Sequence, residues 1–254
     1  MNLNFVDVIV KAGDILLEGM HRDVKANYKG KSDIVTEIDL KSEAFLKEEL
    51  QKIFKGYNFV AEETANKLVD ANKVIYIDPL DGTTNYYHRF PFFAISVAVY
   101  NEGVPVEAAV YNPYYKELFV ANKGEGAYLN GKRLHVSNKR LLEESLIVTG
   151  FTTGVIQKEG KHLVEILKKI SELSHGIRRI GSAALDLCYV AMGVFEGFYE
   201  KGLKPWDVAA GKLIVTEAGG KISDIDGEKH EIDSGFIVAT NSLIHDELLD
   251  ILNE

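Results

Sequence analysis

Residues 78–85, Asp-Pro-Leu-Asp-Gly-Thr-Thr-Asn, combine two carboxylates with glycine and hydroxyl groups and could bind a metal ion and a phosphate group. They follow the β-branched and aromatic residues 74–77, which predict an inner strand that ends at Asp78. Hard cations such as Mg²⁺ prefer oxygen ligands, and the amides of residues 82–84 could open a helix toward an anion. From the residues alone, a turn in which both Asp side chains cap a helix fits about equally well.

Two other acidic positions could join this segment. Glu62 follows a short predicted strand at residues 59–61, and Asp207 stands beside Trp206 at a predicted helix start. The spacing also allows a solvated loop for Glu62 and an ordinary N-cap for Asp207, because a helix start favours a negative side chain.

The first half of the chain predicts two helices and a run of strands. Apolar residues recur at helical spacing over residues 5–20, and a second helix is expected over residues 37–54 with Thr36 as its N-cap. A polar, lysine-rich loop is expected between them. Antiparallel strands separated by turn-forming residues are then expected over residues 93–100, 104–111 and 117–121, with a tight hairpin at residues 130–131.

After about residue 139, strands and helices alternate. Strands are expected at residues 146–149, 177–180, 195–200, 221–223 and 236–240, and helices at residues 159–172, 182–192, 206–218 and 243–252. The fold class is therefore α+β or α/β, with layered sheets and helices. An antiparallel first half (residues 1–138) and an α/β second half (residues 139–254) are expected to form a single compact unit.

The composition narrows the possible partners. A formal net charge of -9 disfavours nucleic acid, which requires a basic surface. The same charge would repel an anionic substrate, so local cations must reverse the field at a phosphate site, which points to bound metal. No apolar run spans a membrane and no signal peptide is apparent, so a cytoplasmic protein is expected. Cys188 is the one cysteine, which rules out an intrachain disulfide and suggests a small buried hydrophobe.

The DPLDGTTN segment, the preceding AEET segment and the later WDVAAG segment together resemble the three metal-binding motifs of the inositol monophosphatase family. The resemblance extends to residues 181–184, 199–200 and 216–220. It implies a layered αβαβα sandwich of the sugar phosphatase type and a cluster of two to three Mg²⁺ ions, of the kind that clamps both oxygens of an in-line displacement. The implied ligands are the side chains of Glu62, Asp78, Asp81 and Asp207 and the carbonyl of Leu80.

The resemblance also implies a reaction. The protein would be a phosphomonoesterase that hydrolyses myo-inositol 1-phosphate, or a related polyol or sugar phosphate, by direct attack of a metal-activated water molecule. Glu62, Thr83 and Asp39 would be the catalytic residues, with Thr83 bonding the water and Asp39 accepting from the threonine hydroxyl. Spacing alone favours a structural role for Asp39, because residues 36–39 fit a capping box.

By the same resemblance, the substrate would contact several backbone and side-chain groups. The amides of Gly82 and Thr83 would hold the phosphate. The polyol hydroxyls would meet Asp81, Gly181, Ser182, Ala183 and Glu200. Thr152 or Thr153 would line the far wall, and Lys29 or Lys31 would be the family's loop lysine.

Two departures from the family pattern bear on the substrate. Lys204 stands where many animal members have histidine, and Ala61 replaces the usual glycine before the paired glutamates. Lys204, with Arg178 and Arg179 nearby in the sequence, could accept a second phosphate, as in members that cleave fructose 1,6-bisphosphate. All three could instead be solvated surface cations. The same residues leave room for a 3′-phosphonucleotide phosphatase, a histidinol-phosphate phosphatase or a non-catalytic binding protein. The resemblance further implies a homodimer and inhibition by Li⁺.

Overall fold

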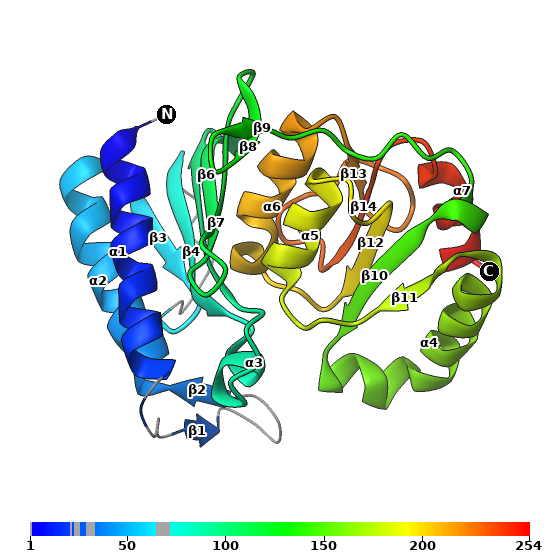
Figure 1. Cartoon of the computed structure of the whole chain (residues 1–254), viewed down its shortest axis with the longest axis horizontal. Coiled ribbons are helices and arrows are strands. Elements are labelled where there is room, and N and C mark those ends of the chain that lie inside the picture. The colour runs from blue at the N-terminus through cyan, green and yellow to red at the C-terminus, as the bar shows by residue number, and fades with distance from the viewer. Residues whose placement is uncertain (1, 21, 23–25, 29–33, 65–71) are drawn as a thin grey trace.

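Helices and sheets alternate in five layers, which confirms the predicted layered sandwich (Figure 1). The structure is a computed structural model that describes residues 2–20, 22, 26–28, 34–64 and 72–254. In layer order, the helices are α1 (Leu3–Met20) and α2 (Glu37–Ile53), then α5 (Ala183–Ala191) and α6 (Pro205–Glu217), then α4 (Thr153–Leu173) and α7 (His245–Leu252). A seven-stranded sheet separates the first pair from the second, and a five-stranded sheet separates the second from the third.

The seven-stranded sheet contains the predicted antiparallel strands. Its order is β3 (Asn58–Ala61), β4 (Lys73–Asp81), β5 (Ala94–Asn101), β6 (Val104–Asn112), β7 (Glu117–Asn122), β8 (Gly126–Leu129) and β9 (Lys132–Arg133). β3 runs parallel to β4, and the other neighbours are antiparallel. The middle residues of β4 are apolar without alternation, because both faces of the strand are covered. Val74 and Tyr76 pack in the hydrophobic core shared with α5 and α6. Ile75 and Ile77 pack in the hydrophobic core shared with α1 and α2.

The five-stranded sheet is mixed. Its order is β11 (Gly176–Arg178), β10 (Leu146–Phe151), β12 (Gly197–Lys201), β14 (Phe236–Thr240) and β13 (Lys221–Ser223), and the 3₁₀ turn η1 (Leu142–Glu144) precedes β10. β10 is parallel to both its neighbours, whereas β14 is antiparallel to β12 and β13. The predicted alternation of strands and helices in this half is therefore confirmed.

The central helix layer lies between the two sheets. Every residue of α5 except Tyr189 is buried, as expected for a helix between two sheets. α6 approaches α5 closely at Gly211, where a Cβ atom would overlap Leu187. Cys188 is fully buried in this layer, in agreement with its predicted role.

The prediction of a loop between α1 and α2 was wrong in part, because this segment contains two short strands. β1 (Ala26–Tyr28) pairs antiparallel with β2 (Ile34–Thr36), and β2 runs directly into α2. The β-branched residues of β2 favour this extended backbone. Lys29 and Lys31 lie outside the described residues. Among the helices that the structure does describe, none has the length and apolarity to cross a bilayer.

Candidate active site

The acidic residues of β4 lie where the strand leaves regular pairing. The register with β5 shifts between Asp78 and Asp81, a segment that includes Pro79, which cannot donate a backbone hydrogen bond. Gly82 follows with a φ of 86° and caps α3 (Thr83–Tyr87). A Cβ atom at Gly82 would lie 3.0 Å from the Phe92 carbonyl oxygen, so this turn requires glycine. The chain therefore bends sharply here and directs two carboxylates away from the sheet.

The other predicted motifs meet β4 at this turn. The backbone N–H of Glu62, just after β3, donates to the carbonyl of Ile77 at 3.1 Å. Asp81 Oδ2 accepts from the Ser182 hydroxyl at 2.6 Å and from the Ala184 amide at 2.7 Å, which ties the β4 turn to the start of α5. Segments far apart in the sequence are thus joined by direct hydrogen bonds.

Asp207 supplies a carboxylate from α6. Its Oδ2 accepts from the backbone N–H of Lys204 at 2.7 Å, so the side chain caps the first turn of the helix. The prediction of an ordinary N-cap was wrong, because Lys204 is the N-cap and Asp207 lies three residues later, where its side chain completes a capping box. Asp207 also lines the same cavity as Asp81, so capping does not remove it from the site.

A cavity of about 580 Å³ opens beside these groups and is large enough for a small phosphorylated metabolite. The predicted residues that line it are Glu62, Asp81, Gly181, Ser182, Ala183, Glu200, Lys204 and Asp207, together with Thr152 and Thr153. Asp78 and Leu80 are buried rather than part of the lining.

The carboxylates perturb one another strongly. Burial, followed by the charges of Glu62, Asp81 and Asp207, raises the pKa of Asp78 well above its usual value. Burial raises the pKa of Asp81 to about 6, although hydrogen bonds from its partners oppose the shift. Burial and then the Asp81 charge raise the pKa of Asp207 well above its usual value. Such a cluster is stabilised in its charged form by bound cations.

Glu200 belongs to the same electrostatic group. Burial and then the Asp81 charge raise its pKa to about 8, whereas Arg179 lowers it. Glu200 pairs with Gly150 on the neighbouring strand β10, where a Cβ atom would overlap the carboxylate. Glycine is therefore needed at residue 150 for Glu200 to reach its position.

Thr83 and Asp39 form a second pair beside the cluster. The Thr83 hydroxyl lies 3.0 Å from Asp39 Oδ1 and 3.0 Å from the Leu80 carbonyl oxygen. Asp39 Oδ2 accepts from the backbone N–H of Thr36 at 2.9 Å, and Thr36 Oγ1 accepts from the Ile38 amide, which completes the predicted capping box. Because the threonine proton goes to one of these acceptors, the lone pairs of the hydroxyl can receive a hydrogen bond from another group.

The oxygen donors of the cluster suit a hard metal ion. Among the described residues, no three acidic, histidine or cysteine side chains form a ready-made cage. Mg²⁺ does not require one, because it usually binds one or two carboxylates and completes its octahedron with waters and phosphate oxygens. The groups here are carboxylates and a carbonyl oxygen, the donors that hard cations prefer. Their mutually raised pKa values indicate a need for positive charge, so the residues fit such an ion.

Gly82 and Thr83 are not part of the cavity lining, and the predicted substrate residue Arg178 lies away from the cavity. Arg178 is exposed on β11 and its guanidinium donates to the Ile177 carbonyl at 3.0 Å. The next residue, Arg179, lines the cavity, and its guanidinium lies 5.6 Å from the centre of the Phe151 ring. The geometry favours Arg179 as the cation at this wall.

The sequence did not identify Gly150, Phe151 or Leu203 as lining residues. Gly150 carries no side-chain chemistry, and only its pairing with Glu200 across β10 and β12 gives it a role. No spacing signal in the sequence identified that pairing in advance.

Comparison with known proteins agrees with the site. A sequence model of the inositol monophosphatase family matches residues 3–254. An inositol-1-monophosphatase of Mesorhizobium japonicum is 41% identical over 96% of this chain and 92% of its own length. A putative Nus factor SuhB of Neisseria meningitidis is 42% identical over 96% of this chain and 94% of its own. The crystal structure of the extragenic suppressor protein SuhB of Bartonella henselae superimposes with a TM-score of 0.93 at 37% identity, over 99% of this chain and 97% of that one. The chain therefore belongs to the inositol monophosphatase family of metal-dependent phosphatases and is a phosphoric monoester hydrolase.

Proposed function

We propose that this protein is a Mg²⁺-dependent phosphomonoesterase that hydrolyses myo-inositol 1-phosphate, or a related polyol or sugar phosphate, by direct attack of water. The observation that carries the proposal is the cluster of mutually perturbed carboxylates beside the Thr83–Asp39 hydrogen bond, at the edge of a cavity of about 580 Å³. A binding module would have no reason to gather so much like charge, since it costs stability.

Two to three Mg²⁺ ions would complete the site. The residues that would hold them are Glu62, Asp78, Asp81, Asp207 and the carbonyl of Leu80. Bound Mg²⁺ supplies positive charge for the phosphate and lowers the pKa of water from about 15.7, so that attack proceeds near neutral pH.

Thr83 and Asp39 would orient the attacking water. Asp39 is fixed by the α2 cap and accepts the Thr83 proton, so the threonine oxygen offers a lone pair to the water. Glu62 would assist as a catalytic carboxylate, and the amides of Gly82 and Thr83 would bind the phosphate. The chain's own contribution is therefore to hold one water and one phosphate in line.

The cavity wall beside Asp81 would bind the remainder of the substrate. Glu200 and the segment from Gly181 to Ala183 would hydrogen-bond to the polyol hydroxyls. A second candidate substrate, fructose 1,6-bisphosphate, is favoured by Lys204 and Arg179, because both cations line the cavity and could meet a second phosphate. Cleavage of 3′-phosphonucleotides or histidinol phosphate lacks such support.

Family membership supports two further expectations, a homodimer and inhibition by Li⁺. From its sequence, the protein would work in the cytoplasm. A second role of the kind that the name Nus factor gives to the Neisseria relative could accompany catalysis.

A phosphate-release panel tests the proposal. Purified protein is assayed with and without Mg²⁺ on inositol 1-phosphate, fructose 1,6-bisphosphate, adenosine 3′,5′-bisphosphate, NADP and histidinol phosphate. We expect Mg²⁺-dependent release from the first or second compound, and Asp81→Asn should abolish it while circular dichroism shows an intact fold. Absence of release from every compound would reject the phosphatase assignment, and an active Asp81→Asn variant would reject the metal role of that residue.

A further inference from the structure

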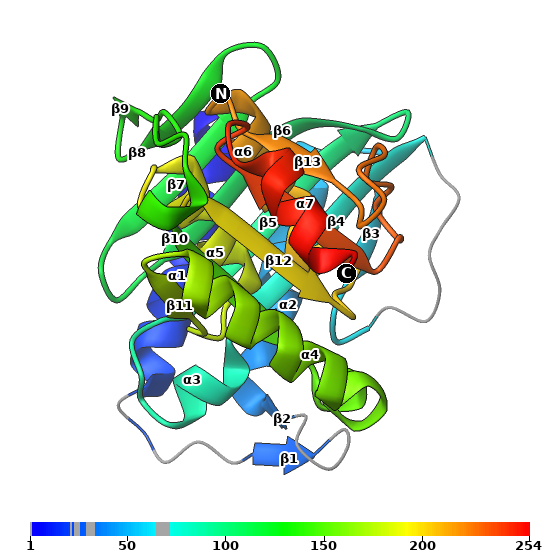
Figure 2. The same cartoon turned by 90° about the vertical axis from the view of Figure 1, so that its right-hand side faces the viewer.

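A second cavity, of about 450 Å³, lies beneath α4 on the outer face of the five-stranded sheet. Figure 2 looks onto this face, which α4 and α7 cover. Side chains alternate across β12, so Glu200 faces the candidate active site whereas Tyr199 and Lys201 face α4. The two cavities therefore lie on opposite faces of the sheet at β10 and β12, where Gly150, Phe151 and Glu200 line both.

A buried tyrosine in this cavity lacks a hydrogen-bond partner. Tyr199 lines the cavity, is only 3% exposed, and its hydroxyl bonds to no other group among the described residues. Burial raises the pKa of Tyr199 and the nearby Thr149 hydroxyl on β10 opposes that shift. The Thr149 hydroxyl nevertheless donates its proton to the Tyr199 backbone carbonyl at 2.7 Å, so that proton is already in use. An unsatisfied buried hydroxyl destabilises the folded state, so such a group requires an explanation.

The cavity exists because the first half of α4 does not pack against the sheet. Of the 21 residues in this helix, only Ile166 and Ile170 are buried. Val155, Glu159 and Leu163 follow at spacings of four residues, so they share one face of the helix, and all three line the cavity. That inward face therefore stands over open space instead of a packed core.

The lining indicates what could fill this space. Most of the wall is apolar, from Val155, Leu163, Ile166, Phe236 and Leu252. Lys201 is already paired with Glu159 at 2.6 Å. Glu254 pairs with Lys169, and among the described residues no lysine or arginine other than Lys201 lines the cavity, so an anion would find no unpaired lysine or arginine there.

We propose that this cavity is a binding site for a small neutral molecule that is mainly apolar and carries one hydroxyl or carbonyl oxygen. The oxygen hydrogen-bonds to the Tyr199 hydroxyl, and the apolar part fills the space between α4 and the sheet. The site is distinct from the phosphatase centre, and the proposal stands whether or not the substrate assignment above is correct.

Benzyl alcohol is a suitable probe, with benzoate as its anionic counterpart. Calorimetric titration of the full-length protein in Mg²⁺ buffer should show saturable 1:1 binding of benzyl alcohol with a millimolar Kd, which is typical of a ligand this small. Benzoate should bind at least tenfold more weakly. Because Gly150, Phe151 and Glu200 line both cavities, the titration is repeated with saturating inorganic phosphate. Persistence of benzyl alcohol binding is expected, whereas competition would place the probe in the active site and overturn the proposal.

Variants locate the probe. Tyr199→Phe should weaken binding by roughly three- to tenfold through loss of one hydrogen bond, without lowering the thermal midpoint, because the hydroxyl has no partner in the described part of the folded chain. Leu163→Trp should fill the space and abolish binding. Val164→Trp, at an adjacent position that is 64% exposed, is the matched control and should bind as wild type does. Unchanged binding in both Tyr199→Phe and Leu163→Trp, or no saturable binding by wild type, would refute the site.

Discussion

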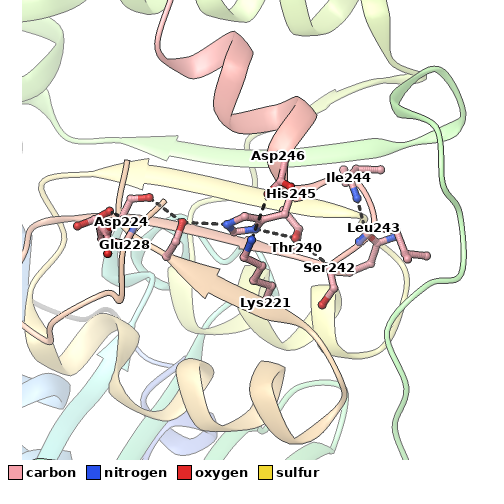
Figure 3. Close-up of polar contacts among 11 residues, drawn as sticks. Lys221, Asp224, Glu228, Thr240, Ser242, Leu243, Ile244, His245 and Asp246 are labelled. Carbon is pink, nitrogen blue, oxygen red and sulfur yellow. Dashed lines mark hydrogen bonds and ion pairs between the residues drawn. The ribbon is translucent and has the colours of Figure 1, made fainter. Parts of the chain in front are cut away.

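His245 should make the stability of this protein fall in mild acid. The residue begins α7 and is fully buried between β13 and β14 (Figure 3). Ser223 Oγ donates to the Asp224 carbonyl at 2.7 Å, so it accepts from His245 Nε2. Thr240 Oγ1 accepts from the Ser242 amide and donates to His245 Nδ1 at 2.9 Å. The neutral imidazole ring therefore makes both hydrogen bonds. A second proton, bound at Nδ1, would point at the hydroxyl proton of Thr240 and break one of them.

The size of the stability loss follows from the pKa of His245. Burial, assisted by the charge of Lys221, lowers the pKa of His245 to about 4, against an ordinary value near 6.5 in the unfolded chain. Between these values the unfolded chain binds a proton that the folded chain does not, so stability is complete above about pH 6.5 and is lost as the pH falls toward 4. The full difference is about 3 kcal/mol, and roughly 2 kcal/mol of it is lost between pH 7 and pH 5.

The assay compares wild type with His245→Gln, which keeps a polar side chain but cannot titrate. Urea unfolding followed by circular dichroism at pH 7, 6 and 5 gives the free energy of unfolding for each protein. The acidic cluster and His230 titrate in both proteins, so their contributions cancel in the comparison. The fall in stability should be smaller in the variant by about 2 kcal/mol. His175→Gln, at an exposed histidine, should follow wild type. Equal pH dependence in wild type and His245→Gln would refute the reasoning.

Three further predictions concern the active site. Thr83→Val should lower kcat by roughly 10²–10⁴-fold with little change in KM, because it removes the hydroxyl that we propose orients the water. Phosphate release over a range of substrate concentrations measures this, and unaltered kcat would contradict it. Asp207→Asn should raise the thermal midpoint of unfolding in EDTA, because it relieves like-charge repulsion. Mg²⁺ should raise the midpoint of this variant less than it raises that of wild type. An equal response to Mg²⁺ in scanning fluorimetry would count against a ligand role for Asp207. Gly150→Ala should displace Glu200 and raise KM more than kcat changes. The control Gly160→Ala adds a methyl group that would meet only Ile156, at 3.8 Å, outside the cavity lining, and should have normal kinetics. Equal kinetics in the two variants would refute the role of Gly150.

Much of the fold could be predicted because local and tertiary preferences agree. Residues 74–77 are apolar and β-branched or aromatic without interruption, as suits a strand covered on both faces, and β4 is such a strand. Thr36 was predicted as a cap, and its hydroxyl accepts from the Ile38 amide at 3.2 Å. In these segments, the residue types that favour the local backbone also match the packing around it.

Features that depend on register or on the approach of distant elements could not be predicted. Arg178 and Arg179 are equivalent in the sequence, and only the end of β11 at Arg178 decides which of them turns toward the cavity. The space beneath α4 is also invisible in the sequence. Its apolar spacing predicts a packed helix, but the separation of that helix from the sheet depends on how α4 and α7 share the outer face.

The capping and catalytic interpretations of the acidic residues proved to be compatible. Asp39 uses Oδ2 for the α2 cap and Oδ1 for Thr83. Asp207 uses Oδ2 for the Lys204 amide, yet lines the cavity with Asp81. Helix starts attract carboxylates for reasons of stability, and several helices begin at this cavity, so the positions that cap a helix are also those that can hold a cation. Spacing therefore cannot separate the two roles at such a site, because one carboxylate has an oxygen for each.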